Sequence, residues 1–502
     1  MDRGVQSASG DGQRSARALP GGILTGFRAI QRLIEGCSAS GLRSSDSRRG
    51  LDILRIEPTG VSVELDVVKQ DARSEIGSVF VSNYPPYSAW SAEHLDAVFD
   101  ALGRRDGATQ APLGLYLHIP FCRKRCKFCY FRVYTDKNSR DVETYMDALA
   151  REIELLHDHP RLAGRAFEFV YFGGGTPSFL SSAQLERLIE RINRTWRWDA
   201  AREVTFECEP GTLKRGKIDA IKAIGVTRLS LGVEHFDDDV LEQNGRAHRS
   251  AEILRAWEWI RQADFQQVNI DLIAGLVGDT EVKWKRTVER TLALQPDSLT
   301  IYQLELPYNA VFARQALEGT TPLEVIDADT KRRWVGYAFE QFEAAGYEIS
   351  SGYTVVRPGP HSAFVYRDSL WRGADMVGAG VASISHVAGV NYQNVDTWDA
   401  YLKAVAAGRL PVGRALPLTD RQRMIRELVL QTKLGRVELD YFDKKYGVDV
   451  RKEFAEPFAE FARRGFGEIR DGALCLTRAG LLRVDLLLRA YFEPQYRNVR
   501  YT

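Results

Sequence analysis

The chain has 502 residues, of which 44% are hydrophobic and 27% are charged, and its formal net charge at pH 7 is +1. A chain of this length can form two or three domains, and the composition is ordinary for a globular protein. The near-zero net charge excludes a global electrostatic attraction to nucleic acid or to a membrane surface. No apolar run reaches the roughly 18 residues that a membrane-spanning helix needs.

Two regions are expected ahead of the first clear strand. Residues 1–50 are rich in Ser, Gly and Arg and lack the apolar core of a secretory signal, so we expect a disordered leader. Residues 51–111 are expected to form an N-terminal extension. Within it, the alternating runs 51–56 and 61–68 predict a hairpin around a Pro-Thr-Gly turn, and residues 92–102 are expected to be helical.

Strand-like and helical runs alternate from residue 115 onward. The first helix is the clearest, because apolar residues from Val142 to Leu156 recur at the spacing of one helical face. Six strands separated by helices favour a parallel sheet in an α/β fold, although the pattern does not say whether the sheet closes. The strand-like runs are 115–119, 167–172, 203–208, 228–233, 268–273 and 299–304.

Three cysteines follow the first strand in the pattern C-x3-C-x2-C: Cys122, Cys126 and Cys129. Thiolates at this spacing can wrap one metal centre, and an iron–sulfur cluster is held by such ligands. A four-iron cluster with three cysteine ligands keeps one iron open for a substrate or cofactor. The alternatives are three structural thiols or a zinc site, but zinc would need a fourth ligand, and no second C-x2-C or H-x3-H is present. Because these thiols must stay reduced, we expect a cytoplasmic protein without disulfides.

Polar residues stand at or just past the carboxyl ends of the strands: Gly173, Glu207, Glu234, Asp271 and Glu305. In α/β barrels the site forms at that rim, so these residues predict one shared pocket. For any single acid, the capping of a helix N-terminus is the alternative. The word GGGTP at 173–177 lets the backbone approach a ligand closely, since Gly has no Cβ, although alone it is equally a tight turn.

The cysteine pattern resembles the cluster motif of the radical S-adenosylmethionine (radical SAM) superfamily. Flanking words narrow the resemblance to the oxygen-independent coproporphyrinogen oxidase (HemN-like) branch, over residues 115 to 488. The resemblance implies an incomplete (β/α)6 barrel at 112–310, a barrel extension at 311–411 and a small winged-helix-like C-terminal domain at 412–502. DNA binding is the generic alternative for that last domain. The words are YLHIPFC at 116–122, GGGTP at 173–177, LSLGVE at 229–234 and NIDLI at 269–273.

The resemblance also implies cofactors and the residues that bind them. The three clustered cysteines would hold a [4Fe–4S] cluster whose fourth iron binds the amino and carboxylate groups of SAM. An electron from the reduced cluster then cleaves SAM to a 5′-deoxyadenosyl radical. By matching positions, Arg246 would meet the methionine carboxylate, with a solvent-facing helix residue as the alternative, and Glu207 and Asp271 would accept from ribose hydroxyls. The remaining cofactor contacts would be Tyr116, Phe128, Gly173, Gly174, Gly175, Thr176 and Glu234.

Two departures count against the best-known functions of this branch. The decarboxylase carries a further cysteine where this chain has Phe131, and the haem chaperone of the HemW type carries an H-N-x-x-Y-W word where this chain has YRDSLW at 366–371. By contrast, IYQLELPY at 301–308 and SSGYT at 350–354 resemble the class C radical SAM methyltransferases and cyclopropanases of natural-product pathways. That class implies two SAM molecules, one of which donates a methylene group to an sp2 carbon.

We therefore predict a radical SAM C1 transferase that methylates or cyclopropanates a natural-product intermediate. Gln303, Glu305 and Tyr308 are the predicted catalytic residues, with Gln303 or Glu305 holding or deprotonating the C1-transfer intermediate. The alternative for Glu305 is that it pairs with a nearby base and closes the barrel. Coproporphyrinogen decarboxylation and haem trafficking are the alternative functions. The expected partners are a small-molecule substrate, a reductant such as flavodoxin or ferredoxin, and a companion methyltransferase. We expect the protein to bind neither nucleic acid nor a membrane, and we expect it to be a monomer.

Overall fold

The computed structural model describes residues 76–77, 79–104, 111–319, 323–497 and 499. The predicted leader at 1–50 and the hairpin predicted in 51–68 lie outside these residues. The helix expected at 92–102 is confirmed as a 3-10 turn, Ala92–His94, followed by α2, Leu95–Gly103. In the part of the chain that the structure describes, no helix is both long enough and apolar enough to cross a membrane.

The centre of the fold is a sheet whose six predicted strands are confirmed as parallel neighbours in chain order. In the described residues, no pairing joins the two outermost strands of this twelve-stranded sheet, so the barrel stays incomplete as expected. The six strands are β1 (Leu113–Ile119), β2 (Phe167–Gly174), β3 (Glu203–Cys208), β4 (Arg228–Glu234), β5 (Gln267–Ala274) and β6 (Ser298–Gln303).

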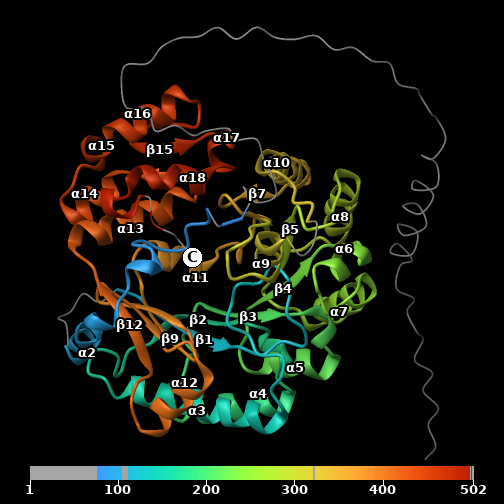
Figure 1. Ribbon diagram of the computed structural model, residues 1–502, viewed down its shortest axis with the longest axis vertical. Helices are drawn as coiled ribbons and strands as arrows, with labels where there is room; N and C mark the ends of the chain where they lie inside the picture. The colour runs from blue at the N-terminus through green and yellow to red at the C-terminus, as the bar shows by residue number, and fades with distance from the viewer. Residues whose placement is uncertain (1–75, 78, 105–110, 320–322, 498, 500–502) are drawn as a thin grey trace, which may run out of the picture. The chain divides into compact units, whose positions relative to one another are not determined.

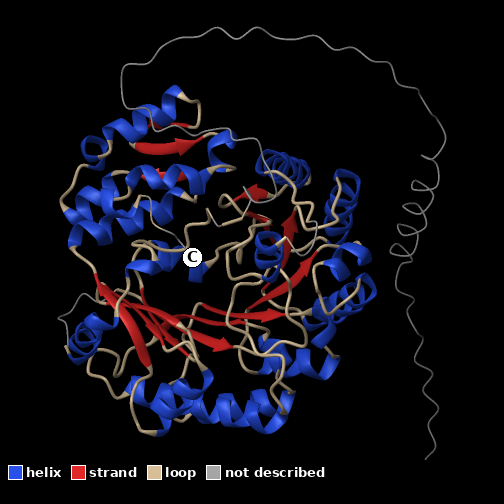
Figure 2. Cartoon of the chain, viewed as in Figure 1, coloured by secondary structure: helices blue, strands red, loops and turns tan. Residues whose placement is uncertain are grey.

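Helices cover the outer face of these strands (Figures 1 and 2). Capping boxes begin two of them, because the side chains of Asn138 and Ser181 accept from backbone N–H groups at the helix starts. The predicted apolar stripe from Val142 to Leu156 is buried in the main hydrophobic core. The helices are α3 (Ser139–His157), α4 (Ser182–Asn193), α5 (Arg215–Ala223), α6 (Asp238–Gln243), α7 (Ser250–Ala263) and α8 (Glu281–Leu294).

The inner face of the sheet is polar. Alternate residues of a strand point to opposite faces, so the apolar alternates pack against the helices while hydroxyl and amide side chains face inward. Asn269 on β5 donates to Ser230 on β4 at 2.9 Å and accepts from Ser298 on β6 at 2.8 Å. This ladder satisfies the side chains of Ser230, Asn269 and Ser298, and the cavity described below borders it.

Further strands extend the sheet at both ends, so the whole sheet is mixed rather than purely parallel. On the β6 side, a strand of only two residues is followed by a second short strand. β9 continues the parallel pairing beside β1, and three antiparallel strands complete that end. These elements are β7 (Glu348–Ile349), β8 (Thr354–Val356), β9 (Asp375–Ala379), β10 (Ile384–Val387), β11 (Val390–Asn394) and β12 (Val412–Pro417), with helices α9 (Val311–Glu318), α10 (Ala328–Ala344), α11 (Val365–Trp371) and α12 (Trp398–Ala406).

The C-terminal residues form helices around a three-stranded antiparallel sheet with its own hydrophobic core. Residues 467–476 form an antiparallel hairpin, β14 and β15. Val81 and Tyr84 of the N-terminal segment pack into this core, so that segment lies between the barrel rim and the C-terminal helices. The elements are α13 (Asp420–Thr432), β13 (Arg436–Glu438), α14 (Asp440–Tyr446), α15 (Val450–Glu453), α16 (Ala455–Arg463), β14 (Gly467–Arg470), β15 (Ala473–Leu476), α17 (Arg478–Leu481) and α18 (Val484–Leu488).

Candidate functional site

A cavity of about 1690 Å³ lies between the carboxyl ends of the barrel strands and the C-terminal helices. Most of the predicted site residues line this one cavity, although they come from six strands or the loops that follow them. Gly173 and Tyr308 are not among its lining residues. Those that line it are Tyr116, Cys122, Cys126, Phe128, Cys129, Gly174, Gly175, Thr176, Glu207, Glu234, Arg246, Asp271, Gln303 and Glu305.

The loop that carries the three cysteines closes on itself after β1. The backbone of Cys122 donates to Tyr134 O at 3.1 Å, and Tyr134 donates back to Pro120 O at 2.7 Å. Within the loop, Cys129 N donates to Cys126 O at 3.1 Å. These bonds hold the chain in a short ring, so all three thiols face the same cavity.

The protonation of the thiols fits a metal-bound role. Burial raises the pKa of Cys122 to about 11 and that of Cys129 to about 12, so both stay thiols unless a cation stabilises the thiolate. Among the described residues, no group of three His, Cys, Asp or Glu side chains converges as if on one metal ion. A four-iron cluster differs from such a site, because each cysteine binds a different iron. The three thiols could therefore hold a cluster.

The GGGTP segment at 173–177 holds the turn after β2 tightly against the cysteine loop. Gly174 has a φ of 112°, and a Cβ there would lie 2.6 Å from the ring of His118. A Cβ on Gly175 would lie 2.8 Å from the backbone of Pro120. Because only glycine fits so close an approach, the turn brings the Thr176 hydroxyl to 3.4 Å from the sulfur of Cys122.

Three carboxylates line the same cavity: Glu207, Glu234 and Asp271. Glu207 accepts from the hydroxyl of Tyr171 at 2.7 Å, and Asp271 accepts from Ser230 at 2.7 Å. Burial raises the pKa of Glu207 and of Glu234 to about 7, and it raises the pKa of Asp271 as well. Asp271 further raises the pKa of both Glu207 and Glu234, and Glu234 further raises that of Glu207. A cationic ligand with hydroxyl or ammonium donors could relieve this repulsion.

Arg246 connects the carboxylates with the cysteine loop. Its guanidinium donates to the backbone oxygen of Gly232 at 2.7 Å, lies 3.4 Å from a carboxylate oxygen of Glu234, and donates to the sulfur of Cys126 at 3.3 Å. Only 11% of its side chain is exposed and it follows α6 rather than lying in a helix, so the solvent-facing alternative was wrong. Its buried Nε has no partner among the described residues.

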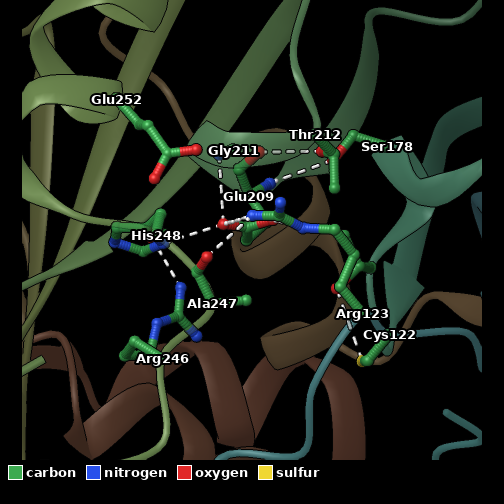
Figure 3. A network of polar contacts seen from close by, with 12 residues as sticks. Cys122, Arg123, Ser178, Glu209, Gly211, Thr212, Arg246, Ala247, His248 and Glu252 are labelled. Carbon is green, nitrogen blue, oxygen red and sulfur yellow. Dashed lines mark hydrogen bonds and ion pairs between the residues drawn. The ribbon is translucent and has the colours of Figure 1, made fainter. Parts of the chain in front are cut away.

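A further acid, Glu209, lies just beyond the end of β3 and is not among the residues predicted from the sequence. Figure 3 shows its carboxylate between His248 and Arg123. Burial alone would raise the pKa of Glu209, but hydrogen bonding and charge from His248, with Arg246 and Arg123, outweigh it and lower that pKa to about 2. The sequence feature that could have identified Glu209 is its spacing from Glu207, because two residues that are two positions apart fall on the same face of an extended chain.

The predicted catalytic residues contact other segments at the barrel rim. Gln303 donates to the backbone oxygen of Leu482 at 3.3 Å. Glu305 accepts from the backbone N–H groups of Val79 and Phe80 at 3.2 and 3.3 Å. Tyr308 is 42% exposed. Glu305 thus holds the N-terminal segment over the cavity, a contact that no local sequence pattern predicts.

Comparison with known proteins decides the family. Residues 116–291 match the model of the Radical SAM superfamily, and residues 418–483 match that of the HemN C-terminal domain. The heme chaperone HemW of Synechocystis sp. is 30% identical over 303 residues, which cover 59% of this chain and 71% of that protein. This chain belongs to the HemN-like radical SAM family.

Other members of the HemN-like family agree with the fold. The oxygen-independent coproporphyrinogen III oxidase of Escherichia coli (strain K12) is 28% identical, over 74% of this chain and 84% of that protein. The solved structure of coproporphyrinogen III oxidase (HemN) from Escherichia coli superposes with a TM-score of 0.72 at 24% identity, over 82% of this chain and 96% of that chain. The predicted radical SAM α/β fold with a HemN-like C-terminal domain is thereby confirmed.

The same comparisons correct the predicted function. The HemN-like relatives are named coproporphyrinogen III oxidase or heme chaperone HemW, so the prediction of a natural-product C1 transferase was wrong. Departures at single positions such as Phe131 do not outweigh the similarity over most of the chain. Family membership implies a [4Fe–4S] cluster and SAM. The catalytic roles predicted for Gln303, Glu305 and Tyr308 were roles in C1 transfer, so they no longer apply.

Proposed function

We propose that this HemN-like protein is a radical SAM enzyme that oxidatively decarboxylates propionate side chains of a porphyrinogen. The observation that carries the proposal is a buried cation in the cavity wall. Arg228 is 2% exposed, lines the cavity, and donates through Nε to Gln267 at 2.8 Å. Its terminal nitrogens make no hydrogen bond to the described part of the chain. The charge of Arg228 acts against burial to lower the pKa of the neighbouring carboxyls of Glu203 and Asp271. Its terminal nitrogens would in addition hold a substrate carboxylate, which fits the planar fork of a guanidinium.

Aromatic rings support this assignment of the wall. The ring of Phe364 lies 4.0 Å from the guanidinium carbon of Arg228 and 5.7 Å from that of Arg367. Tyr171 and Tyr366 pack at 4.3 Å between ring centroids in the same wall. Flat apolar surface beside cationic groups suits a tetrapyrrole, which has a large hydrophobic body and carboxylate side chains.

The chain's own residues would bind and orient the cofactors. Cys122, Cys126 and Cys129 would hold the cluster, and the carboxylates of Glu207, Glu234 and Asp271 would accept from the donors of SAM. When bound, the cluster and SAM supply a carbon-centred radical that takes a hydrogen atom from the substrate. The propionate then becomes a vinyl group with release of CO2, and one electron passes to an acceptor. Arg228 would hold a carboxylate of the substrate, and the aromatic wall would exclude water.

The test is anaerobic turnover of the reconstituted, reduced protein with SAM and coproporphyrinogen III. We expect 5′-deoxyadenosine to form together with vinyl products and CO2. Arg228→Gln should weaken porphyrinogen binding about tenfold or more, because it removes a charge-assisted hydrogen bond. Arg202→Gln is the matched control, since Arg202 pairs with Glu168 at the surface. The proposal would be contradicted if SAM were cleaved at the same rate with and without the porphyrinogen and the porphyrinogen were recovered intact.

Haem trafficking is the second candidate, and the 30% identity to heme chaperone HemW favours it. Haem also carries propionates, so the same cationic wall would receive it. Tight haem binding without coupled formation of deoxyadenosine would identify this function. Equilibrium dialysis with labelled SAM in the same preparations would count one or two bound molecules. A flavodoxin or ferredoxin remains the expected reductant, which reduction assays with each protein would test.

A further inference from the structure

Glu209 touches neither a cluster cysteine nor one of the three rim carboxylates, yet every polar atom of this residue is engaged (Figure 3). Its backbone N–H donates to the hydroxyl of Ser178 at 3.0 Å, and its backbone oxygen accepts from the hydroxyl of Thr212 at 2.8 Å. Its side chain accepts from the backbone N–H of Gly211 at 3.1 Å. The carboxylate therefore has a fixed position at the end of β3.

One arm of this network reaches the cysteine loop. Arg123 directly follows Cys122, and its Nε and terminal nitrogen donate to the two oxygens of Glu209 at 3.1 and 3.0 Å. The same terminal nitrogen donates to the backbone oxygen of Ala247 at 3.0 Å. This is the two-pronged geometry in which a guanidinium binds a carboxylate most strongly. A Cβ on Gly211 would lie 1.9 Å from the guanidinium, so the glycine at that position leaves room for it.

The other arm reaches Arg246. Nδ1 of His248 lies 2.9 Å from Glu209, and Nε2 lies 3.2 Å from the backbone oxygen of Val233. His248 is completely buried, so these two contacts set the position of the chain two residues after Arg246. Arg246 in turn donates to the sulfur of Cys126 at 3.3 Å. The carboxylate of Glu209 is thus connected to the Cys122 end of the cysteine loop through Arg123. It is connected to the Cys126 end through His248 and Arg246.

We infer that Glu209 is a positioning residue that holds the cluster loop through Arg123 and sets the place of Arg246 through His248. The two arms have different consequences. The Arg123 arm closes the loop around the cluster, so its loss should let iron leave faster. The His248 arm aims Arg246 into the cavity, so its loss should weaken SAM binding and alter the hydrogen bond to the Cys126 sulfur. Such hydrogen bonds help to set the electronic properties of a cluster.

The experiment compares three variants of the reconstituted full-length protein. Release of iron to a chelator measures the first arm, and the dissociation constant of SAM measures the second, with the EPR spectrum of the reduced cluster recorded with and without SAM. Arg123→Gln should speed iron release about tenfold with little change in SAM affinity. His248→Gln should weaken SAM binding about tenfold and reduce the spectral change that SAM causes. Glu209→Gln should do both.

The control is Glu252→Gln, the same chemical change on the neighbouring helix α7, where Glu252 caps the backbone of Arg249. It should leave both measurements at the wild-type values. A double variant of Arg123 and Glu209 should release iron no faster than either single variant, since both changes break one contact. The inference is overturned if Glu209→Gln leaves iron release and SAM affinity unchanged. It is equally overturned if all three variants alter both quantities in proportion to a fall in melting temperature. Because Arg123 is one-third exposed, its variant should fold and allow that comparison.

Discussion

SAM binding should depend on pH through Glu207, and the perturbation that tests this is Glu207→Gln. The carboxyl has a pKa of about 7 instead of 4.5, chiefly because burial penalises its charge and because Asp271 and Glu234 repel it. Tyr171 donates to one of its oxygens, and a backbone hydrogen bond from Gly174 also favours the ionised form. Because each carboxylate oxygen can accept more than one hydrogen bond, Glu207 can still accept from a ribose hydroxyl. Only the ionised form accepts strongly, so affinity for SAM should rise with pH through about 7.

The size of the effect comes from that pKa. At pH 6 about nine-tenths of Glu207 is protonated and at pH 8 about nine-tenths is ionised, so SAM should bind about tenfold more weakly at pH 6, a difference of about 1.4 kcal/mol. Glu207→Gln should remove the part of this dependence that Glu207 contributes, leaving that of Glu234, whose pKa burial also raises to about 7. It should lower the affinity at pH 8 by about 1.5–3 kcal/mol, the strength of a hydrogen bond to a charged group.

The assay is anaerobic titration calorimetry of the reconstituted protein with SAM between pH 6 and 8. SAM itself titrates in this range, but it does so equally with both proteins, so the difference between the two curves isolates Glu207. Parallel curves for wild type and variant would refute the reasoning and show that Glu207 does not contact SAM in its ionised form.

Three further results are expected. Replacing Cys122, Cys126 and Cys129 together with Ala should abolish iron binding in a colorimetric iron assay while Cys475→Ser retains it; iron kept by the triple variant would contradict the cluster. Asp375→Ala should cost about 3–5 kcal/mol in denaturant unfolding, because Arg161 and Arg165 would lose their buried partner at 3.4 and 2.9 Å; a loss below 1 kcal/mol would mean that the pair is solvated. Burial raises the pKa of Glu152 from 4.5 to about 7, so the folded state binds more protons between these values and stability should fall as pH rises through that window, by up to about 3 kcal/mol. Glu152→Gln should remove this part of the pH dependence in melting curves, and an unchanged slope would refute it.

Much of the barrel was predictable because its signals are local. Apolar periodicity from Val142 to Leu156 gave the first helix, and the six strand-like runs gave the parallel strands. The rim carboxylates Glu207, Glu234 and Asp271 could be placed together because a parallel sheet gathers its strand ends at one edge. The order of the outer strands was not predictable: β9 pairs with β1 although it lies more than 250 residues later in the chain.

The specific function was predicted wrongly for a related reason. Phe131 and the short segment at the end of β6 are local features, whereas the proposed substrate-binding wall is built by distant segments. Arg228 on β4 and Arg367 on α11 share the ring of Phe364, and their joint charge exists only in the folded cavity.

The sequence by itself determined the cysteine motif, the strand and helix pattern and the carboxylates at the strand ends, because spacing and periodicity act over a few residues. Only the tertiary structure decided which of these groups meet. Arg123 and Glu209 are 86 residues apart in the chain and Arg246 and Cys126 are 120 apart, so no local pattern links them. The parallel strands bring them together, since each strand ends at the same rim and its loop must turn back over that rim. The sheet therefore decides which residues are neighbours at the rim, whereas the sequence decides the chemistry of each residue there.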